Sequence, residues 1–384
     1  MAQVLQTLIF AMLSTAVSTE EQRVRILTPL RVREIPDRFH GFEKYFDKYV
    51  PVLPSDLLGS RGVQVVATNG VLDSKVERVA NVLAEFLDND EDGELDNAKV
   101  AASMRQRGAT MIMFKDQDEM EASGLDQIPG FDMQDCEGAE TGSNRTLHAH
   151  VMTAGPSHAC RHKPELICDA PLEEVLHLVT DTGFGPAYPK YFSTTAGSAM
   201  TISMDAMIGT CGFATRENPF GKHTHFRFPH CSGKYHYDDD TCDYNCLATE
   251  YIHHFVASYN GEYPWGRDDV PCPGSQGPRA DEWELCADAP DGDLEPSRKL
   301  LREGDPDFFA LLTDPSFRVP LRMPRGSYEP PRGQDSDNLQ EVADARQALP
   351  ITAFGRITLQ GHLRRAHRSR AAARASAAAA SVLV

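Results

Sequence analysis

The positions of the cysteines restrict the fold of this 384-residue chain more than any other feature of the sequence. All nine lie between residues 136 and 286, in a region rich in glycine and proline. Such clustering is typical of disulfide bonds in a loop-rich region. Local pairs such as Cys160–Cys168 and Cys272–Cys286 fit, but the sequence leaves the connectivity open, and the odd count leaves one thiol over. The spacing excludes a zinc ribbon, because no C-x-x-C occurs. The nine are Cys136, Cys160, Cys168, Cys211, Cys231, Cys242, Cys246, Cys272 and Cys286.

The amino-terminal residues predict export. An apolar stretch runs from Val4 to Val17, and Ala16-Val17-Ser18 offers a small-x-small cleavage pattern. No Lys or Arg precedes the stretch, so a helix of the folded protein is the alternative. The stretch is too short for a membrane span. Together with the cysteines it predicts a signal peptide at residues 1–18 and a secreted protein, or one of the secretory-pathway lumen, with a glycosylation sequon at Asn144.

Charge narrows the set of partners. The net charge is −18, yet no acid follows Asp344, and residues 1–344 alone carry 31 basic and all 56 acidic residues, a net charge of −25. Residues 1–344 are therefore acidic enough to repel nucleic acid phosphate and anionic membranes and to attract cations. We therefore expect metal ions as partners, no nucleic acid and no integral membrane span.

The apolar periodicity predicts an α+β fold. Residues 62–67 and 109–114 are short and apolar, as in β-strands. Between them, apolar residues at helical spacing predict a helix over residues 74–87, capped by Asp73, and a second helix near residues 97–106. Residues 60–125 should thus form a β-α-loop-α-β unit.

The rest of the chain is less regular. Residues 126–170 show little periodicity, helical patterns return over residues 171–270, and apolar residues from 308 to 321 predict a last helix and strand. We expect one large disulfide-containing core with a helical metal-site region. Its expected parts are the signal peptide, an α/β unit (residues 19–125), a Cys/His-rich α+β region packed against it (residues 126–330) and a flexible Ala/Arg-rich tail (residues 331–384).

An acidic run between the two predicted helices carries the sharpest motif. Six acids lie between positions 88 and 96, with Gly93 at the sixth position of the run. The run resembles EF-hand, dockerin and thrombospondin-type calcium loops over about a dozen residues, and Ca²⁺ prefers six to eight oxygen ligands in such a loop. Lys99 stands where an EF-hand has its bidentate Glu. The alternative is a solvated acidic turn. The resemblance implies a calcium ion bound by Asp88, Asp90, Asp92 and Asp96.

A second motif lies on a predicted amphipathic helix near residues 172–180. Glu173 and His177 are one turn apart, with Glu174 beside them. The motif resembles the H-E-x-x-H helix of zincin metallopeptidases, in which two His bind zinc and the Glu activates zinc-bound water. The resemblance implies that His177 is a zinc ligand and Glu174 the catalytic base. Glu173 stands at the position of the first His and would bind the metal as a carboxylate. An ordinary surface triplet is the alternative.

A third constellation, Thr249 to Phe255, places Glu250 on one helical face with His253 and His254. In one zincin branch a downstream helical Glu is the third zinc ligand, a role that Glu250 fits. Alternatively, Glu174-x-x-His177 and Glu250-x-x-His253 are two E-x-x-H units, as in di-iron carboxylate bundles, with Glu85 as a further ligand. The predicted strands and disulfides argue against such a bundle.

His223 and His225, which alternate as on a strand, form a weaker metal or ligand motif, with an exposed loop favoured. No G-x-S-x-G, Walker loop or G-x-G-x-x-G occurs, so neither serine hydrolase chemistry nor nucleotide binding is supported. Three functions stay open. They are a secreted calcium-binding protein that is also a zincin-like hydrolase, a non-catalytic calcium-binding structural or interaction protein, and a di-iron carboxylate oxidoreductase.

Overall fold

The computed structural model divides the chain into two compact units, residues 1–331 and 332–384, and describes parts of the first unit only. The predicted signal peptide, the Asn144 sequon, His223, His225 and the tail beyond Pro331 lie outside the described residues. The described residues are 24–36, 44–55, 61–123, 131–133, 147–153, 170–209, 233–237, 242–260, 283–287 and 293–331.

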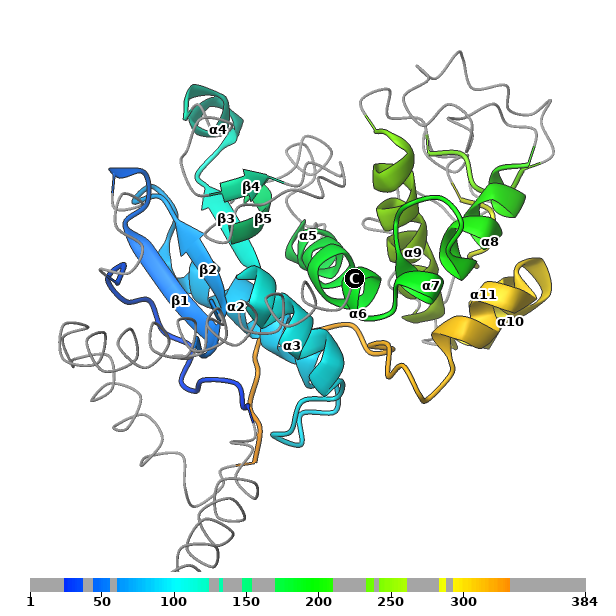
Figure 1. Cartoon of the computed structure of the whole chain (residues 1–384), viewed down its shortest axis with the longest axis horizontal. Coiled ribbons are helices and arrows are strands. Elements are labelled where there is room, and N and C mark those ends of the chain that lie inside the picture. The colour runs from blue at the N-terminus through cyan, green and yellow to red at the C-terminus, as the bar shows by residue number, and fades with distance from the viewer. Residues whose placement is uncertain are drawn as a thin grey trace, which may run out of the picture. The chain divides into compact units, whose positions relative to one another are not determined.

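A five-stranded mixed sheet is built from residues 48–153 (Figure 1). The strand order is β1-β2-β3-β5-β4; β1 pairs antiparallel with β2, and the other neighbours are parallel. Every side chain of β2 and β3 is buried, as expected for strands covered on both faces. The strands are β1 (Lys48–Leu53), β2 (Val63–Ala67), β3 (Thr110–Phe114), β4 (Phe131–Met133) and β5 (Leu147–Thr153).

Two helices connect β2 to β3, and a short third helix follows β3. The helices are α2 (Asp73–Leu87), α3 (Ala98–Arg107) and α4 (Gln117–Ala122). Helix α2 packs an apolar stripe against β1, β2 and the later helix α5. Asn97 caps α3 through its side chain. The predicted cap at Asp73 is wrong: Asp73 is the first helical residue, and its carboxylate pairs with Lys48 Nζ at 2.6 Å.

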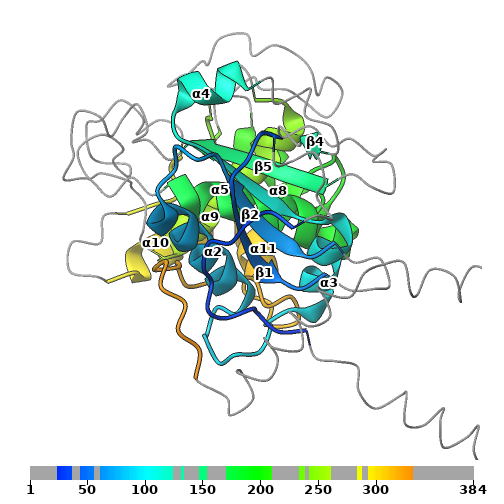
Figure 2. The same ribbon diagram turned by 90° about the vertical axis from the view of Figure 1, so that its left-hand side faces the viewer.

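The remaining helices lie beyond the sheet. In Figure 1 the sheet, α5 and α9 follow one another across the view, and in Figure 2, seen from the sheet side, both helices lie behind the strands. One continuous hydrophobic core joins all three layers. The helices are α5 (Ala170–Val179), the π-helix η5 (Thr180–Phe184), α6 (Gly185–Ala187), α7 (Pro189–Phe192), α8 (Ala199–Ile208), α9 (Tyr244–Asn260), α10 (Glu295–Gly304) and α11 (Pro306–Leu312).

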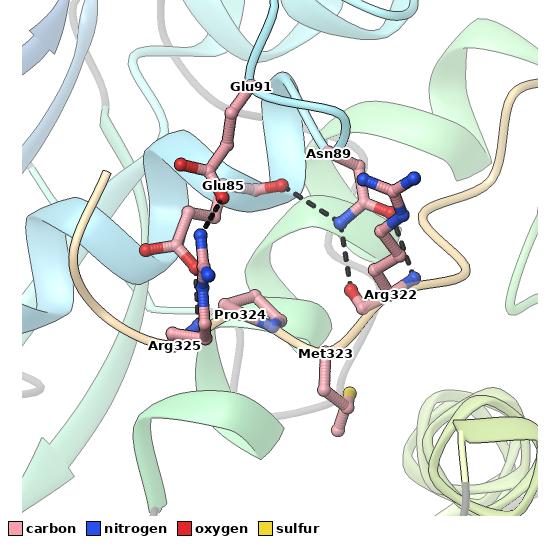
Figure 3. Close-up of a pocket in the computed structure, with 7 residues that line it drawn as sticks. All are labelled: Glu85, Asn89, Glu91, Arg322, Met323, Pro324 and Arg325. Atoms are coloured by element: carbon pink, nitrogen blue, oxygen red, sulfur yellow. Dashed lines mark hydrogen bonds and ion pairs between the residues drawn. The ribbon is translucent and has the colours of Figure 1, made fainter. Parts of the chain in front are cut away.

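The last described residues return to α2. We call residues 322–331 the strap. The Glu85 carboxylate accepts hydrogen bonds from the backbone N–H groups of Arg325 and Ser327, and Tyr328 donates its hydroxyl to Asp88 at 2.5 Å. A pocket opens between the strap and the end of α2 (Figure 3), lined by Glu85, Asn89, Glu91, Arg322, Met323, Pro324 and Arg325.

The fold is thus α+β, as predicted, with local differences. The two strands and two helices predicted between residues 62 and 114 are present, as β2, α2, α3 and β3. The predicted strand near residue 320 is wrong: residues 317–321 form no strand, and the Phe317 carbonyl accepts a hydrogen bond from the Asn97 side chain instead. Strands β1, β4 and β5 had no counterpart in the sequence prediction.

One disulfide of the described residues has both partners defined. Cys242 and Cys246 are joined with their Cα atoms 5.2 Å apart, at the start of α9. Cys286 is also disulfide-bonded. The other six cysteines, and with them the pairing of Cys160, Cys168 and Cys272, lie outside the described residues. Among the described helices, none is both long and apolar enough to span a bilayer.

Candidate metal centre

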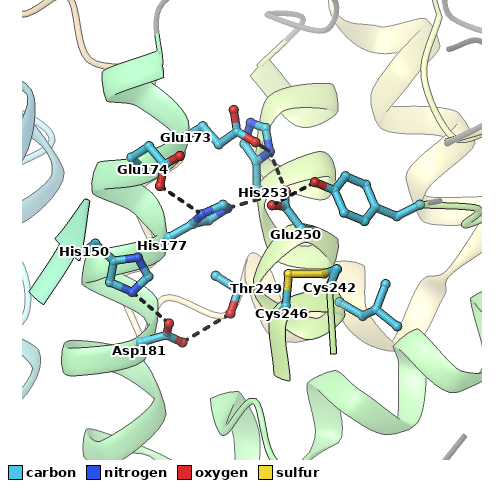
Figure 4. Close-up of polar contacts among 12 residues, drawn as sticks. His150, Glu173, Glu174, His177, Asp181, Cys242, Cys246, Thr249, Glu250 and His253 are labelled. Carbon is cyan, nitrogen blue, oxygen red and sulfur yellow. Dashed lines mark hydrogen bonds and ion pairs between the residues drawn. A yellow bond between two sulfur atoms is a disulfide. The ribbon is translucent and has the colours of Figure 1, made fainter. Parts of the chain in front are cut away.

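The apolar stripe of α5 fixes the direction of its polar residues. Val175, Leu176 and Val179 are fully buried, and α5 packs on β3, β5, α2 and α9. Glu173 and His177 therefore lie on the side that meets α9 (Figure 4). The His177 side chain is only 4% exposed, whereas Glu173 keeps 27% of its side-chain surface.

Helix α9 supplies the other half. It is buried along most of its length because its aromatic residues, including Tyr251 and Phe255, pack against Trp283 and Phe308. Glu250 and His253 lie one turn apart and face α5 (Figure 4). The Tyr237 hydroxyl donates a hydrogen bond to Oε1 of Glu250 at 3.4 Å.

Four side chains from the two helices converge on one point. One ligand atom from each of Glu173, His177, Glu250 and His253 lies within 4.8 Å of the others. Glu250 Oε2 is 3.5 Å from His177 Nε2 and 3.6 Å from His253 Nδ1, and Glu173 Oε1 is 3.8 Å from His253 Nδ1. These separations exceed a good hydrogen bond and match the spacing of atoms around a shared cation.

Two of these ligand atoms are buried without a hydrogen bond. Among the described residues, neither His177 Nε2 nor Glu250 Oε2 has a hydrogen-bond partner. A buried polar atom that makes no hydrogen bond costs about 1–3 kcal/mol, and here the two atoms offset part of that cost as an ion pair at 3.5 Å. A metal ion would satisfy both atoms at once.

Burial and the close approach of the charged side chains shift the pKa values of three residues of the cluster. Burial raises the pKa of Glu173, and the Glu250 carboxylate raises it further, to about 7. Burial opposes protonation of His177, but Glu250 and Glu174 outweigh it and hold the His177 pKa well above its usual value. Burial likewise opposes ionisation of Glu250, yet His177 and His253 keep the Glu250 pKa well below its usual range.

A histidine of the sheet adjoins the cluster. His150 of β5 contacts Asp181 of η5, with Nε2 3.0 Å from Oδ2. Thr249 of α9 donates to the other oxygen of Asp181 at 3.2 Å. A π-helical turn such as η5 is frequent at functional sites. Here it holds Asp181 between the sheet and α9. Gly183 is required there, because a Cβ would lie 2.7 Å from Val100 Cγ1.

Glu174 faces the other side of His177. Its Oε2 lies 3.7 Å from His177 Nδ1, and its side chain is 31% exposed. His150, Glu174 and His177 form a second group whose ligand atoms lie within 4.8 Å of one another. Glu85, weighed as a di-iron ligand, bonds the strap instead.

The acidic loop is a separate group. One oxygen from each of Asp88, Asp90 and Asp96 lies within 4.8 Å of the others. Asp92 is not part of this group; its carboxylate accepts the Glu94 N–H at 2.8 Å. Gly93 has the left-handed conformation (φ 89°) that the predicted turn needs. Burial raises the pKa of both Asp88 and Asp96.

Comparisons with known proteins do not assign the chain to a family. No family model, no curated protein and no solved structure matches it. Function must therefore be inferred from the residues of the site themselves.

The sequence alone points to Glu173, Glu174, His177 and Glu250, and the structure places the three carboxylates around His177. The sequence prediction made His253 a metal ligand only in the di-iron alternative, as part of Glu250-x-x-His253, and it missed His150 and Asp181. The i,i+3 spacing of Glu250 and His253 was a usable signal, whereas nothing in the sequence links His150 of β5 to α5.

Proposed function

We propose that the protein is a metal-dependent hydrolase whose divalent transition-metal ion is bound by Glu173, His177, Glu250 and His253. The observation that carries the proposal is the convergence of four ligand atoms from two helices, two of them buried without a hydrogen bond. Imidazole and carboxylate ligands suit Zn²⁺, and also Mn²⁺ or Fe²⁺. The resemblance of residues 173–177 to the zincin helix supports zinc in particular.

The surroundings favour a catalytic site over a closed structural one. Glu173 and Glu174 are each about 30% exposed, so solvent reaches one side of the centre. A bound divalent ion polarises a carbonyl or phosphoryl oxygen and lowers the pKa of a coordinated water. Glu174, which is open to solvent and faces Nδ1 of His177, would be the proton acceptor that the zincin resemblance implies. Tyr237 and His253 hold Glu250 in position.

The experiment is elemental analysis of the purified full chain before and after chelation, together with a hydrolysis screen. We expect at least one tightly bound transition-metal ion per chain at this centre, and loss of bound metal in His177→Ala without unfolding. A parent protein that binds no transition metal would overturn the proposal. Metal binding without any hydrolytic activity would contradict the catalytic role and show that the centre is structural.

We also propose a structural calcium ion in the acidic loop. Asp88, Asp90 and Asp96 bring three oxygens together, and burial raises the pKa of Asp88 and Asp96, so keeping these acids ionised is costly without a cation. Arg325 and Arg318 offset part of this charge through Glu91 and Asp96. An oxidising compartment is supported by the Cys242–Cys246 disulfide, in keeping with the secretion expected from the sequence.

A further inference from the structure

The second group of ligands adjoins the first and shares only His177 with it. One ligand atom from each of His150, Glu174 and His177 lies within 4.8 Å of the other two. We propose that the centre binds two divalent cations, the second of them through His150, Glu174 and Nδ1 of His177. This inference rests on the proposed metal centre, adds an ion to it and assigns His177 to the second ion instead of the first.

His150 is held in the orientation of a metal ligand. Its ring is 4% exposed, and Nε2 lies 3.0 Å from the carboxylate of Asp181, which is 8% exposed. A carboxylate that accepts from one ring nitrogen puts the hydrogen there and leaves the lone pair on the other nitrogen. In Figure 4 that other nitrogen, Nδ1, lies on the side of Glu174 and His177. Asp181 is itself fixed by Thr249.

The two ring nitrogens of His177 determine which ligands bind each ion. Its Nδ1 faces Glu174 at 3.7 Å and its Nε2 faces Glu250 at 3.5 Å. A neutral imidazole offers one lone pair, so His177 serves one ion only. With Nδ1 on the second ion, the Nε2–H faces Glu250 at 3.5 Å, and Glu173, Glu250 and His253 bind the first ion. Each ion then has three protein ligands and open positions, as catalytic sites require.

The charges agree with two ions. Glu173, Glu174 and Glu250 are carboxylate ligands, and Asp181 stands directly behind His150. These four negative charges balance two divalent cations when the three histidines are neutral. A single ion would leave two negative charges uncompensated in a largely buried place, which is costly.

The proposal changes the role of Glu174, and this gives the test. The full chain is stripped with a chelator, saturated with excess Ca²⁺ to fill the acidic loop, and titrated with Zn²⁺. Bound zinc per chain is counted by elemental analysis after gel filtration. We expect two Zn²⁺ for the parent and one for Glu174→Gln and His150→Gln. Glu303→Gln, an exposed carboxylate change on α10, is the control and should bind two.

A second measurement reports whether the ions are neighbours. The parent loaded with Mn²⁺ should give the electron paramagnetic resonance signal of a coupled pair, and Glu174→Gln the signal of an isolated ion. Asp181→Asn, which keeps the ligands but loosens His150, should weaken the second ion about 10–100-fold and leave the first.

The outcomes separate the two proposals. One zinc in both the parent and Glu174→Gln, with activity lost only in the variant, would make Glu174 a base and overturn the second ion, while the proposed function stands. Two ions retained in both Glu174→Gln and His150→Gln would also overturn it. No zinc in the parent would overturn both proposals.

Discussion

Glu173 occupies the position where a zincin helix has its first histidine, and the exchange changes the character of the centre. Its carboxylate lies 3.8 Å from Nδ1 of His253 on α9, so the ligands of the four-residue group are two carboxylates and two imidazoles. Oxygen-rich sets bind harder cations relatively well. Manganese or iron therefore competes with zinc here more strongly than at a site rich in histidine.

The adjacent histidines of α9 give a matched pair of variants. His253 belongs to the ligand group, whereas His254 stacks on Trp283. We expect His253→Gln to weaken transition-metal binding by more than about 100-fold, since loss of a mere supporting residue already costs 10–100-fold. His254→Gln should bind metal as the parent does. Calorimetric titration in excess Ca²⁺ measures both. Equal losses in the two variants would show that α9 had been disturbed and that the ligand assignment is unsupported.

At the scale of elements, the acidic loop joins α2 to α3 and also meets the strap. Asp88 accepts the hydroxyl of Tyr328 and the N–H of Gly93, so a buried carboxylate at the end of α2 depends on a residue 240 positions later. The loop and the strap therefore stabilise each other.

Calcium should raise the melting temperature because it binds the folded loop. At a calcium concentration 100 times the dissociation constant the gain is about 2.7 kcal/mol, or roughly 4 °C for a unit of 331 residues. The double variant Asp90→Ala with Asp92→Ala should lose the gain. Because Asp92 lies outside the group of three oxygens, Asp92→Ala alone should keep most of it. A double variant that responds to calcium like the parent would contradict the calcium site.

The strap can be tested through one hydroxyl. Tyr328→Phe leaves the ring in place and removes the hydrogen bond to buried Asp88. We expect a loss of about 1–3 kcal/mol in the free energy of unfolding, measured by urea denaturation without calcium. An unchanged midpoint would show that the strap contributes little to stability.

For the whole molecule, the metal-free protein should lose stability as the pH rises. The folded-state pKa of Glu173, about 7, exceeds its ordinary value of 4.5, so its contribution is complete below about pH 4.5 and is lost by about pH 7. The raised pKa of His177 acts in the same direction above pH 6.5. Glu173 alone is worth up to about 3 kcal/mol.

Thermal melts of chelated protein from pH 5 to pH 8 measure this slope, and Glu173→Gln should flatten it. Zinc should reverse it, because metal binding needs deprotonated ligands. A chelated parent that gains stability between pH 5 and pH 8 would contradict the arrangement of charges.

Thiol counting tests the covalent framework. Cys242, Cys246 and Cys286 are already disulfide-bonded, and the clustering of all nine cysteines predicts that most of the others are oxidised. Denatured, unreduced protein should therefore show few free thiols. Finding most of the nine free would argue against both the disulfides and the predicted secretion.

The sequence predicted those features that depend on residues close together in the chain. The stripe of α2 and the i,i+4 pair Glu173 and His177 follow from helical spacing alone. Strand β1 was missed because it carries Pro51, which is tolerated only at an edge such as this one. Strand β5, and with it His150, was missed because parallel pairing with β3 is a non-local contact. The meeting of α5 and α9 depends on tertiary packing, so the sequence could suggest Glu250 as a ligand but not show its approach.

The strap also sets an order of events during synthesis. The Glu85 carboxylate bonds the N–H of Ser327 across 242 positions of the chain. While the ribosome is still making the region between them, the end of α2 has emerged, but Glu85 and Asp88 still lack the hydrogen bonds that the strap supplies. The end of α2 therefore gains its last hydrogen bonds only when almost all of the first unit has been translated. A nascent chain that stops short of residue 325 exposes an unfinished acidic end of α2 to chaperones and proteases.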